Sequence, residues 1–86
     1  LPADTTYDAL KKAQAQHDVA AAFLAAHTLK GVSASLGLQQ LAEAASALTE
    51  QLRPQTDFPE ETYFTAVDNA YACVIKALAT FENKEC

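Results

Sequence analysis

The sequence has few residues that interrupt helices: two glycines and three prolines in 86 positions. Glycine and proline are the residues least favourable in the interior of an α-helix, so their scarcity beside abundant alanine favours long helices. The strict alternation of apolar and polar residues that indicates a half-buried β-strand is also missing. The composition therefore predicts an all-α protein.

Clusters of basic residues are missing too. Six Lys and Arg stand against eleven Asp and Glu, which gives a formal net charge of −5. A nucleic-acid partner requires a basic face that neutralises phosphates, so we expect no nucleic-acid binding. Every apolar run is too short or too broken to span a bilayer, and we expect no membrane contact by this domain itself.

Features of metal sites and hydrolase sites are absent as well. The two histidines and two cysteines do not have the close spacings typical of zinc ligands, so the sequence predicts no metal site. The chain also contains neither a nucleophile elbow nor an oxyanion loop, which argues against a Ser-His-Asp hydrolase.

The two cysteines are Cys73 and Cys86. If one helix runs through both, a rise of about 1.5 Å per residue separates them by roughly 20 Å, too far for a disulfide. Unpaired cysteines favour a reducing, cytoplasmic setting. The length fits a single domain, residues 1–86, and because the chain opens on Leu1 we expect it to be a piece excised from a larger protein.

Four amphipathic segments divide the chain, and we predict helices at residues 4–16, 19–36 and 38–53 and a fourth helix that follows the turn at 54–61 and continues to about residue 83. Asp18 is a suitable N-cap for the second helix, Gly37 a suitable terminator of it, and Pro54 stops the third. Asp57 is a candidate cap of the fourth helix, with Pro59 in its first turn. Apolar residues form one stripe on each of these helices, at spacings of three and four in the third and fourth. The stripes comprise Tyr7, Leu10 and Ala13 in the first helix, Leu38, Leu41, Ala45, Leu48 and Leu52 in the third, and Phe64, Val67, Tyr71, Val74, Leu78 and Phe81 in the fourth. These patterns, joined by short turns, predict an antiparallel four-helix bundle.

His27 faces away from the predicted core of that bundle. At about 100° per residue, the core stripe of the second helix lies on the opposite side from the histidine. The stripe comprises Ala25, Leu29, Val32 and Leu36. The histidine is surrounded instead by Ala20, Phe23, Leu24, Lys30, Gly31, Ala34 and Ser35.

Three of these neighbours suggest how the histidine is used. Lys30 is the only formally charged residue between positions 19 and 42, so an anion at His27 meets one cation and no carboxylate of this segment. Gly31 costs about 1 kcal/mol relative to alanine in a helix, and it leaves space beside the outer nitrogen of the imidazole. Phe23 and Leu24, exposed beside the histidine, form an apolar patch suited to a protein partner.

The stretch AHTLKGVSASLG resembles the signature of histidine-containing phosphotransfer (HPt) domains of bacterial-type phosphorelays. The resemblance rests on His27, Lys30, Gly31, Ser35 and Gly37, followed by a leucine-striped helix of the expected length. It covers about the central half of the chain, and the outer helices match only in pattern. It implies an antiparallel four-helix bundle with a phospho-accepting histidine exposed on the second helix.

The resemblance also implies a mechanism and partners. His27 accepts a phosphoryl group from the aspartate of a receiver domain and passes it to the receiver of a response regulator. Lys30 stabilises the phosphoryl group, because charge spreads over its oxygens during transfer, and Gly31 gives steric access. The residues expected to dock the receiver are Phe23, Leu24, Ala20, Ala34 and Ser35.

The same resemblance implies that the domain is a carrier without autonomous catalysis. The receiver supplies Mg²⁺, and no cofactor belongs to this domain. The parent chain implied is a hybrid sensor histidine kinase, with this domain in the cytoplasm, as a free-standing protein or at the cytoplasmic end of a membrane-bound kinase.

Two alternatives remain open at this point. One is the phosphoacceptor domain of a chemotaxis-type kinase, which receives its phosphoryl group from a kinase domain. The other is a helical adaptor that keeps the fold without being phosphorylated. The intact set of His27, Lys30 and Gly31 favours a carrier, since an adaptor has no need of it.

Overall fold

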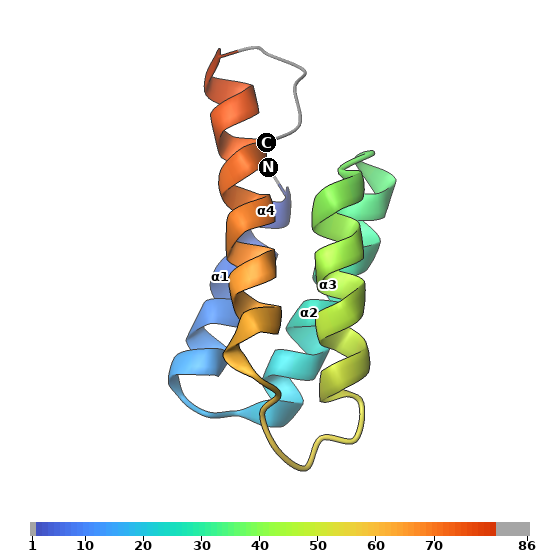
Figure 1. Ribbon diagram of the computed structural model, residues 1–86, viewed down its shortest axis with the longest axis vertical. Coiled ribbons are helices and arrows are strands. Elements are labelled where there is room, and N and C mark those ends of the chain that lie inside the picture. The colour runs from blue at the N-terminus through green and yellow to red at the C-terminus, as the bar shows by residue number, and fades with distance from the viewer. Residues whose placement is uncertain (1, 81–86) are drawn as a thin grey trace.

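The computed structural model describes residues 2–80, and within them the chain forms four α-helices and no strand. The helices are α1 (Pro2–Ala15), α2 (Val19–Ser35), α3 (Gln39–Leu52) and α4 (Glu61–Thr80). They run alternately up and down as an antiparallel bundle (Figure 1). The prediction of an all-α, antiparallel four-helix bundle is confirmed, and the first three helices begin and end within two residues of the predicted positions.

The bundle is a short rod, 40 × 21 × 20 Å. Each helix packs on the next one in the chain, with α2 and α3 forming a hairpin and α1 and α4 lying side by side (Figure 1). Sequential helices joined by turns of a few residues have this antiparallel arrangement because a short turn returns the chain along its neighbour. This arrangement places α4 diagonally across the bundle from α2.

Local hydrogen bonds fix both ends of α2. Asp18 is its N-cap, since the carboxylate accepts from the backbone N–H of Ala21 at 3.1 Å. At the other end Gly37 has a φ of 75°, and the N–H groups of Gly37 and Leu38 donate to the carbonyls of Ala34 and Ser33 at 3.2 and 2.8 Å. These two bonds form a Schellman motif, in which glycine is favoured at the left-handed position. Both predicted caps of α2 are confirmed.

The α1–α2 turn has the same geometry without a glycine. His17 occupies the left-handed position with a φ of 55°, and Asp18 N–H donates to the carbonyl of Ala13 at 2.9 Å. The His17 ring lies edge-on to Phe58, with 5.5 Å between ring centroids. His17 therefore has a structural place in an interhelix turn, far from His27 in the fold.

A single apolar core runs along the axis of the bundle. Its largest fully buried apolar side chains are Leu10, Leu29, Leu41, Leu48, Leu52 and Val67. Alanines occupy core positions between closely packed helices, among them Ala22, Ala25 and Ala26 of α2. The predicted stripes of the first and third helices are found in this core, except that Tyr7 and Leu38 are half-buried against its edge.

Two residues of the predicted core stripes lie outside the core. Leu36 is 42% exposed, because α2 ends at Ser35 and the helical register does not extend to the capping residue. Leu78 is 51% exposed, because the last turns of α4 rise beyond the α2–α3 turn and have no helix of the hairpin beside them (Figure 1). Phe81, also predicted in this stripe, lies outside the described residues.

Ser33 occupies a core position that the apolar pattern of the sequence did not predict. Its side chain is fully buried, and its hydroxyl has no hydrogen-bond partner among the described residues. A buried hydroxyl without a partner costs about 1–3 kcal/mol. The core face of α2 thus includes Ser33, Ala22 and Ala26 as well as the predicted Ala25 and Leu29. Its centre is rotated about the helix axis relative to the predicted stripe.

The start of α4 differs from the prediction. Asp57 does not cap the helix, since its carboxylate accepts from the N–H of its neighbour Phe58 at 2.8 Å and α4 begins only at Glu61. Pro59 therefore lies in the α3–α4 loop and not in the first helical turn. The residues predicted to extend this helix beyond 80 lie outside the described residues.

Cys73 on α4 is in a disulfide bond, so the prediction that the cysteines stay unpaired is wrong. That prediction assumed one continuous helix as far as Cys86, a residue that lies outside the described part of the chain. The cysteines therefore give no support to a reducing compartment.

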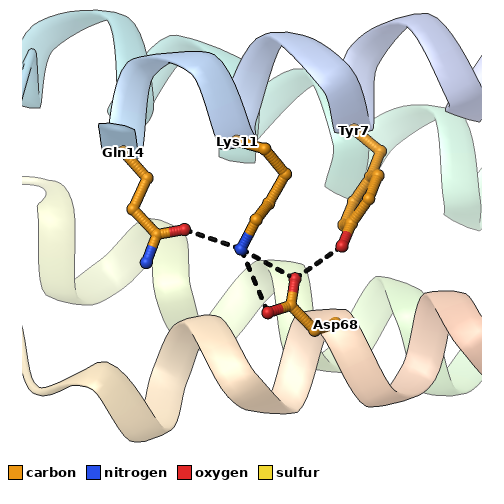
Figure 2. A network of polar contacts seen from close by, with 4 residues as sticks. All are labelled: Tyr7, Lys11, Gln14 and Asp68. Carbon is orange, nitrogen blue, oxygen red and sulfur yellow. Dashed lines mark hydrogen bonds and ion pairs between the residues drawn. The ribbon is translucent and has the colours of Figure 1, made fainter. Parts of the chain in front are cut away.

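Contact between α1 and α4 depends on long polar and aromatic side chains. Figure 2 shows Asp68 of α4 accepting from the hydroxyl of Tyr7 at 2.6 Å and from the ammonium of Lys11 at 3.0 Å. Gln14 accepts from the same ammonium at 2.7 Å. The rings of Tyr7 and Tyr71 stack with centroids 4.0 Å apart, which fixes the two helices side by side.

None of the described helices is long and apolar enough to cross a membrane.

Candidate functional site

His27 lies in the middle of α2, and its side chain is exposed. The buried residues Ala26 and Leu29 flank it along the helix and hold the opposite face of α2 against the core. The adjacent Thr28 turns its hydroxyl back to the carbonyl of Leu24 at 2.9 Å. A rigid, capped helix therefore presents the imidazole to solvent, as the sequence predicts.

An open hollow of about 540 Å³ adjoins the imidazole. It is lined by His27, Thr28, Gly31, Val32, Ser35 and Leu36. Leu36 borders this hollow because it leaves the core at the end of α2. The hollow gives a partner room to approach the ring from the C-terminal side of the helix.

Gly31 forms the floor of this approach. A Cβ atom placed on it would meet nothing within 4 Å, so packing inside the domain does not require a glycine here. The backbone is ordinary helix, without the positive φ that requires glycine elsewhere in the chain. The space next to His27 is therefore available to something outside the domain.

Most of the predicted docking residues are accessible. Ala20, Ala34 and Ser35 are exposed, and Leu24 is 66% exposed. They extend along α2 on both sides of His27, so one helix presents small residues, a leucine and the imidazole on the same surface. An accessible surface of small and apolar residues suits close approach by another folded protein.

Phe23 differs from its expected place. It is half-buried and packs against the core, so it is not an exposed residue of the apolar patch. Its ring centroid lies 6.2 Å from that of His27, at an angle of 57°. The guanidinium of Arg53, at the end of α3, covers the ring at 5.7 Å. The α2–α3 packing brings this cation over Phe23, and the sequence of α2 alone does not reveal it.

Lys30 is half-buried at the side of α2, and its electrostatic surroundings include the carboxylate of Glu50 on α3. Glu50 accepts two hydrogen bonds from Arg53, from Nε at 3.2 Å and from Nη2 at 2.5 Å. The Arg53 bonds first, and then the charges of Arg53 and Lys30, lower the pKa of the Glu50 carboxyl.

Glu50 and Arg53 belong to the surroundings of the candidate site, and the sequence analysis did not identify them. A signal was present: Phe23 and Arg53 lie at nearly equal distances along the chain from Gly37, so an antiparallel hairpin brings them together. The i,i+3 spacing of Glu50 and Arg53 also predicts an ion pair on one face of the helix.

Metal ligands do not gather in the part of the chain that the structure describes. No group of three or more His, Cys, Asp or Glu side chains there has an arrangement that would hold a metal ion.

Fold and site together define a four-helix bundle domain that presents one histidine to solvent from its second helix. The model of the Hpt domain family matches residues 3–78. The chain therefore belongs to the Hpt family, and the resemblance seen in the sequence is confirmed. Comparisons with curated proteins and with solved structures gave no match. Membership assigns to the chain a role in histidine phosphotransfer within a phosphorelay, a process in which Hpt domains interact with receiver domains.

Proposed function

We propose that His27 is the phospho-accepting residue and that it carries a phosphoryl group between two receiver domains. The observation that carries this proposal is the exposed imidazole beside an open hollow on α2. Of the two histidines of the chain, His17 is also exposed and borders another hollow, but it occupies the left-handed position of the α1–α2 turn with its ring edge-on to Phe58. His27 lies in the middle of α2 beside Lys30 and Gly31, and it is the histidine to which the HPt resemblance applies.

Transfer of the phosphoryl group from the receiver to His27 needs no further reactant. The outer ring nitrogen of neutral His27 attacks phosphorus in line, a nitrogen–phosphorus bond forms, and the bond to the aspartyl oxygen of the receiver breaks. The receiver aspartate leaves as a carboxylate, and the second receiver later takes the group by the reverse step. Lys30 is the cation that α2 offers to the phosphoryl oxygens, whose charge must be stabilised during transfer.

The receiver supplies Mg²⁺ in this proposal, and the Hpt domain supplies position and access. The hollow formed by Gly31, Ser35 and Leu36 receives the part of the receiver that surrounds its aspartate. Leu24, Ala20 and Ala34 extend the contact along α2. A hybrid sensor kinase as the parent chain, and a cytoplasmic location, remain predictions that accompany this function.

The test is transfer of labelled phosphate from a phosphorylated receiver, in the presence of Mg²⁺, to the wild-type domain and to two matched variants. His27→Gln should take no label, whereas His17→Gln should take label like the wild type. The label should be acid-labile, as a phosphoramidate bond is. Circular dichroism should show that His27→Gln keeps its helicity, because the ring is exposed.

Other results would change the proposal in defined ways. Label that persists in His27→Gln would place the acceptor elsewhere and contradict it. Label obtained only from a chemotaxis-type kinase domain would make the chain a kinase phosphoacceptor. A wild-type domain that takes no label from receivers or from a kinase would support a helical adaptor.

A further inference from the structure

Two cations of different helices lie near His27. Lys30 follows it on α2, and Arg53 closes α3 with its guanidinium 5.7 Å from the centre of the Phe23 ring. The Phe23 ring is in turn 6.2 Å from that of His27. These two distances together keep the Arg53 guanidinium within about 12 Å of the imidazole, a range that the reorientation of a long side chain can shorten.

Arg53 is engaged with a carboxylate in the unphosphorylated domain. Glu50 binds it in a two-pronged pair, at 3.2 Å to Nε and 2.5 Å to Nη2. The side chains are 55% and 56% exposed, so water competes with the pair and the pair can open. Exposed ion pairs are weak for this reason, even when their geometry is good.

Lys30 is not held in the same way. It makes no ion pair with Glu50 among the described residues, and its charge is the smallest of the causes that lower the pKa of the Glu50 carboxyl. Arg53 is therefore the cation whose position Glu50 sets by contact. A phosphoryl group on His27 carries more negative charge than a carboxylate at neutral pH, so it would compete with Glu50 for Arg53.

We propose that Glu50 is a positioning residue that holds Arg53 away from His27 and thereby limits how strongly the domain stabilises phosphorylated His27. The inference rests on the proposed function and adds a regulation of the same site. With Glu50 in place, the phosphoryl group must draw the Arg53 guanidinium away from a carboxylate. A carrier gains from this limit, because a phosphoryl group that is bound too firmly is passed on poorly.

The test compares Glu50→Gln with the wild type in two measurements. The first is the equilibrium distribution of labelled phosphate between one receiver and the domain. The second is the lifetime of phosphorylated His27 after loading with phosphoramidate, which transfers its phosphoryl group to imidazole and releases ammonia. Glu50→Gln should shift the distribution about two- to fivefold toward the domain, the range expected for an exposed charge pair, and it should lengthen the lifetime.

Three controls separate a local effect from a general one. Glu43→Gln removes the same charge from an exposed position of α3 and should shift the distribution less. Glu50→Asp keeps the charge and should restore most of the wild-type distribution. In an Arg53→Gln background, Glu50→Gln should have a smaller effect, because the cation that Glu50 holds is gone. Thermal melting should show that none of these variants unfolds the domain.

The outcomes distinguish this inference from the proposed function. Wild-type His27 that takes label, with Glu50→Gln behaving like the wild type, overturns the inference and leaves the proposed function standing. Equal shifts for Glu43→Gln and Glu50→Gln overturn it as well, since net charge alone then accounts for the effect. A wild-type domain that takes label at His27 from neither a receiver nor phosphoramidate overturns both.

Discussion

Single residues decide how closely a partner can approach His27. Gly31 has no neighbour within 4 Å of where its Cβ would be, and it borders the hollow beside the imidazole. Inside the domain an alanine or a longer side chain would fit, and a helix would be more stable with it. The glycine thus costs the domain stability at a position where packing inside the domain does not require it.

Gly31→Gln should raise the free energy of unfolding by up to about 1 kcal/mol, because glutamine is a better helix former, and should slow phosphotransfer, because its side chain enters the hollow. Urea denaturation measures the first effect and single-turnover transfer from a receiver the second. Ala66→Gln, exposed on α4 diagonally across the bundle, is the control and should leave transfer unchanged. Equal transfer rates for wild type and Gly31→Gln would contradict the steric role of the glycine.

At the scale of helices, α1 is attached to α4 by two tyrosines that bond in opposite directions. Tyr7 of α1 donates to Asp68 of α4, and Tyr71 of α4 donates to Asp4 of α1. Burial, and then the bond to Asp68, raises the pKa of Tyr7. Burial, and then the bond to Asp4, raises the pKa of Tyr71 to about 12. Both hydroxyls therefore stabilise the folded bundle in their neutral form.

The pH dependence of stability follows from these shifts. A group whose pKa is higher in the folded state than in the unfolded state adds to the stability of the fold. For tyrosine this contribution is complete below the unfolded pKa of about 10, and it is lost as the pH rises through the folded pKa. The free energy of unfolding should therefore fall between about pH 10 and 12. Urea denaturation across this range should show a shallower fall for Tyr71→Phe, which keeps the ring stack but has no hydroxyl to ionise. Parallel curves for variant and wild type would show that the helix contact does not shift this pKa.

At the scale of the whole molecule, one helix serves both the core and the site. α2 buries Leu29 completely in the axis of the bundle and exposes Leu24 on the surface that carries His27. The two leucines differ only in the face of the helix they occupy. Substituting each of them by alanine therefore separates effects on folding stability from effects on binding of the receiver.

Leu29→Ala should lower the free energy of unfolding by about 2–5 kcal/mol, because it leaves a cavity in a closed core. Leu24→Ala should change that free energy by less than about 0.5 kcal/mol, as exposed substitutions generally do, while weakening association with the receiver. Chemical denaturation and a binding titration measure the two effects. Should Leu24→Ala bind the receiver as well as the wild type does, Leu24 would be removed from the docking surface.

The sequence determined those features that depend on neighbours within a turn or two. The number of helices, the limits of the first three, the Asp18 cap, the Gly37 terminator and the outward face of His27 all follow from spacing and local hydrogen bonding. The signature around His27 was also contained in one continuous stretch, so the family was recognisable from it.

The tertiary structure alone decided which residues meet across helices and where the bundle stops. Arg53 over Phe23, Glu50 near Lys30, and Tyr7 with Asp68 join positions far apart in the chain. Leu36 and Leu78 fit an apolar stripe by spacing, yet both are exposed. The physical reason is that helical periodicity gives the direction of a side chain, whereas burial depends on whether a neighbouring helix reaches that level of the rod.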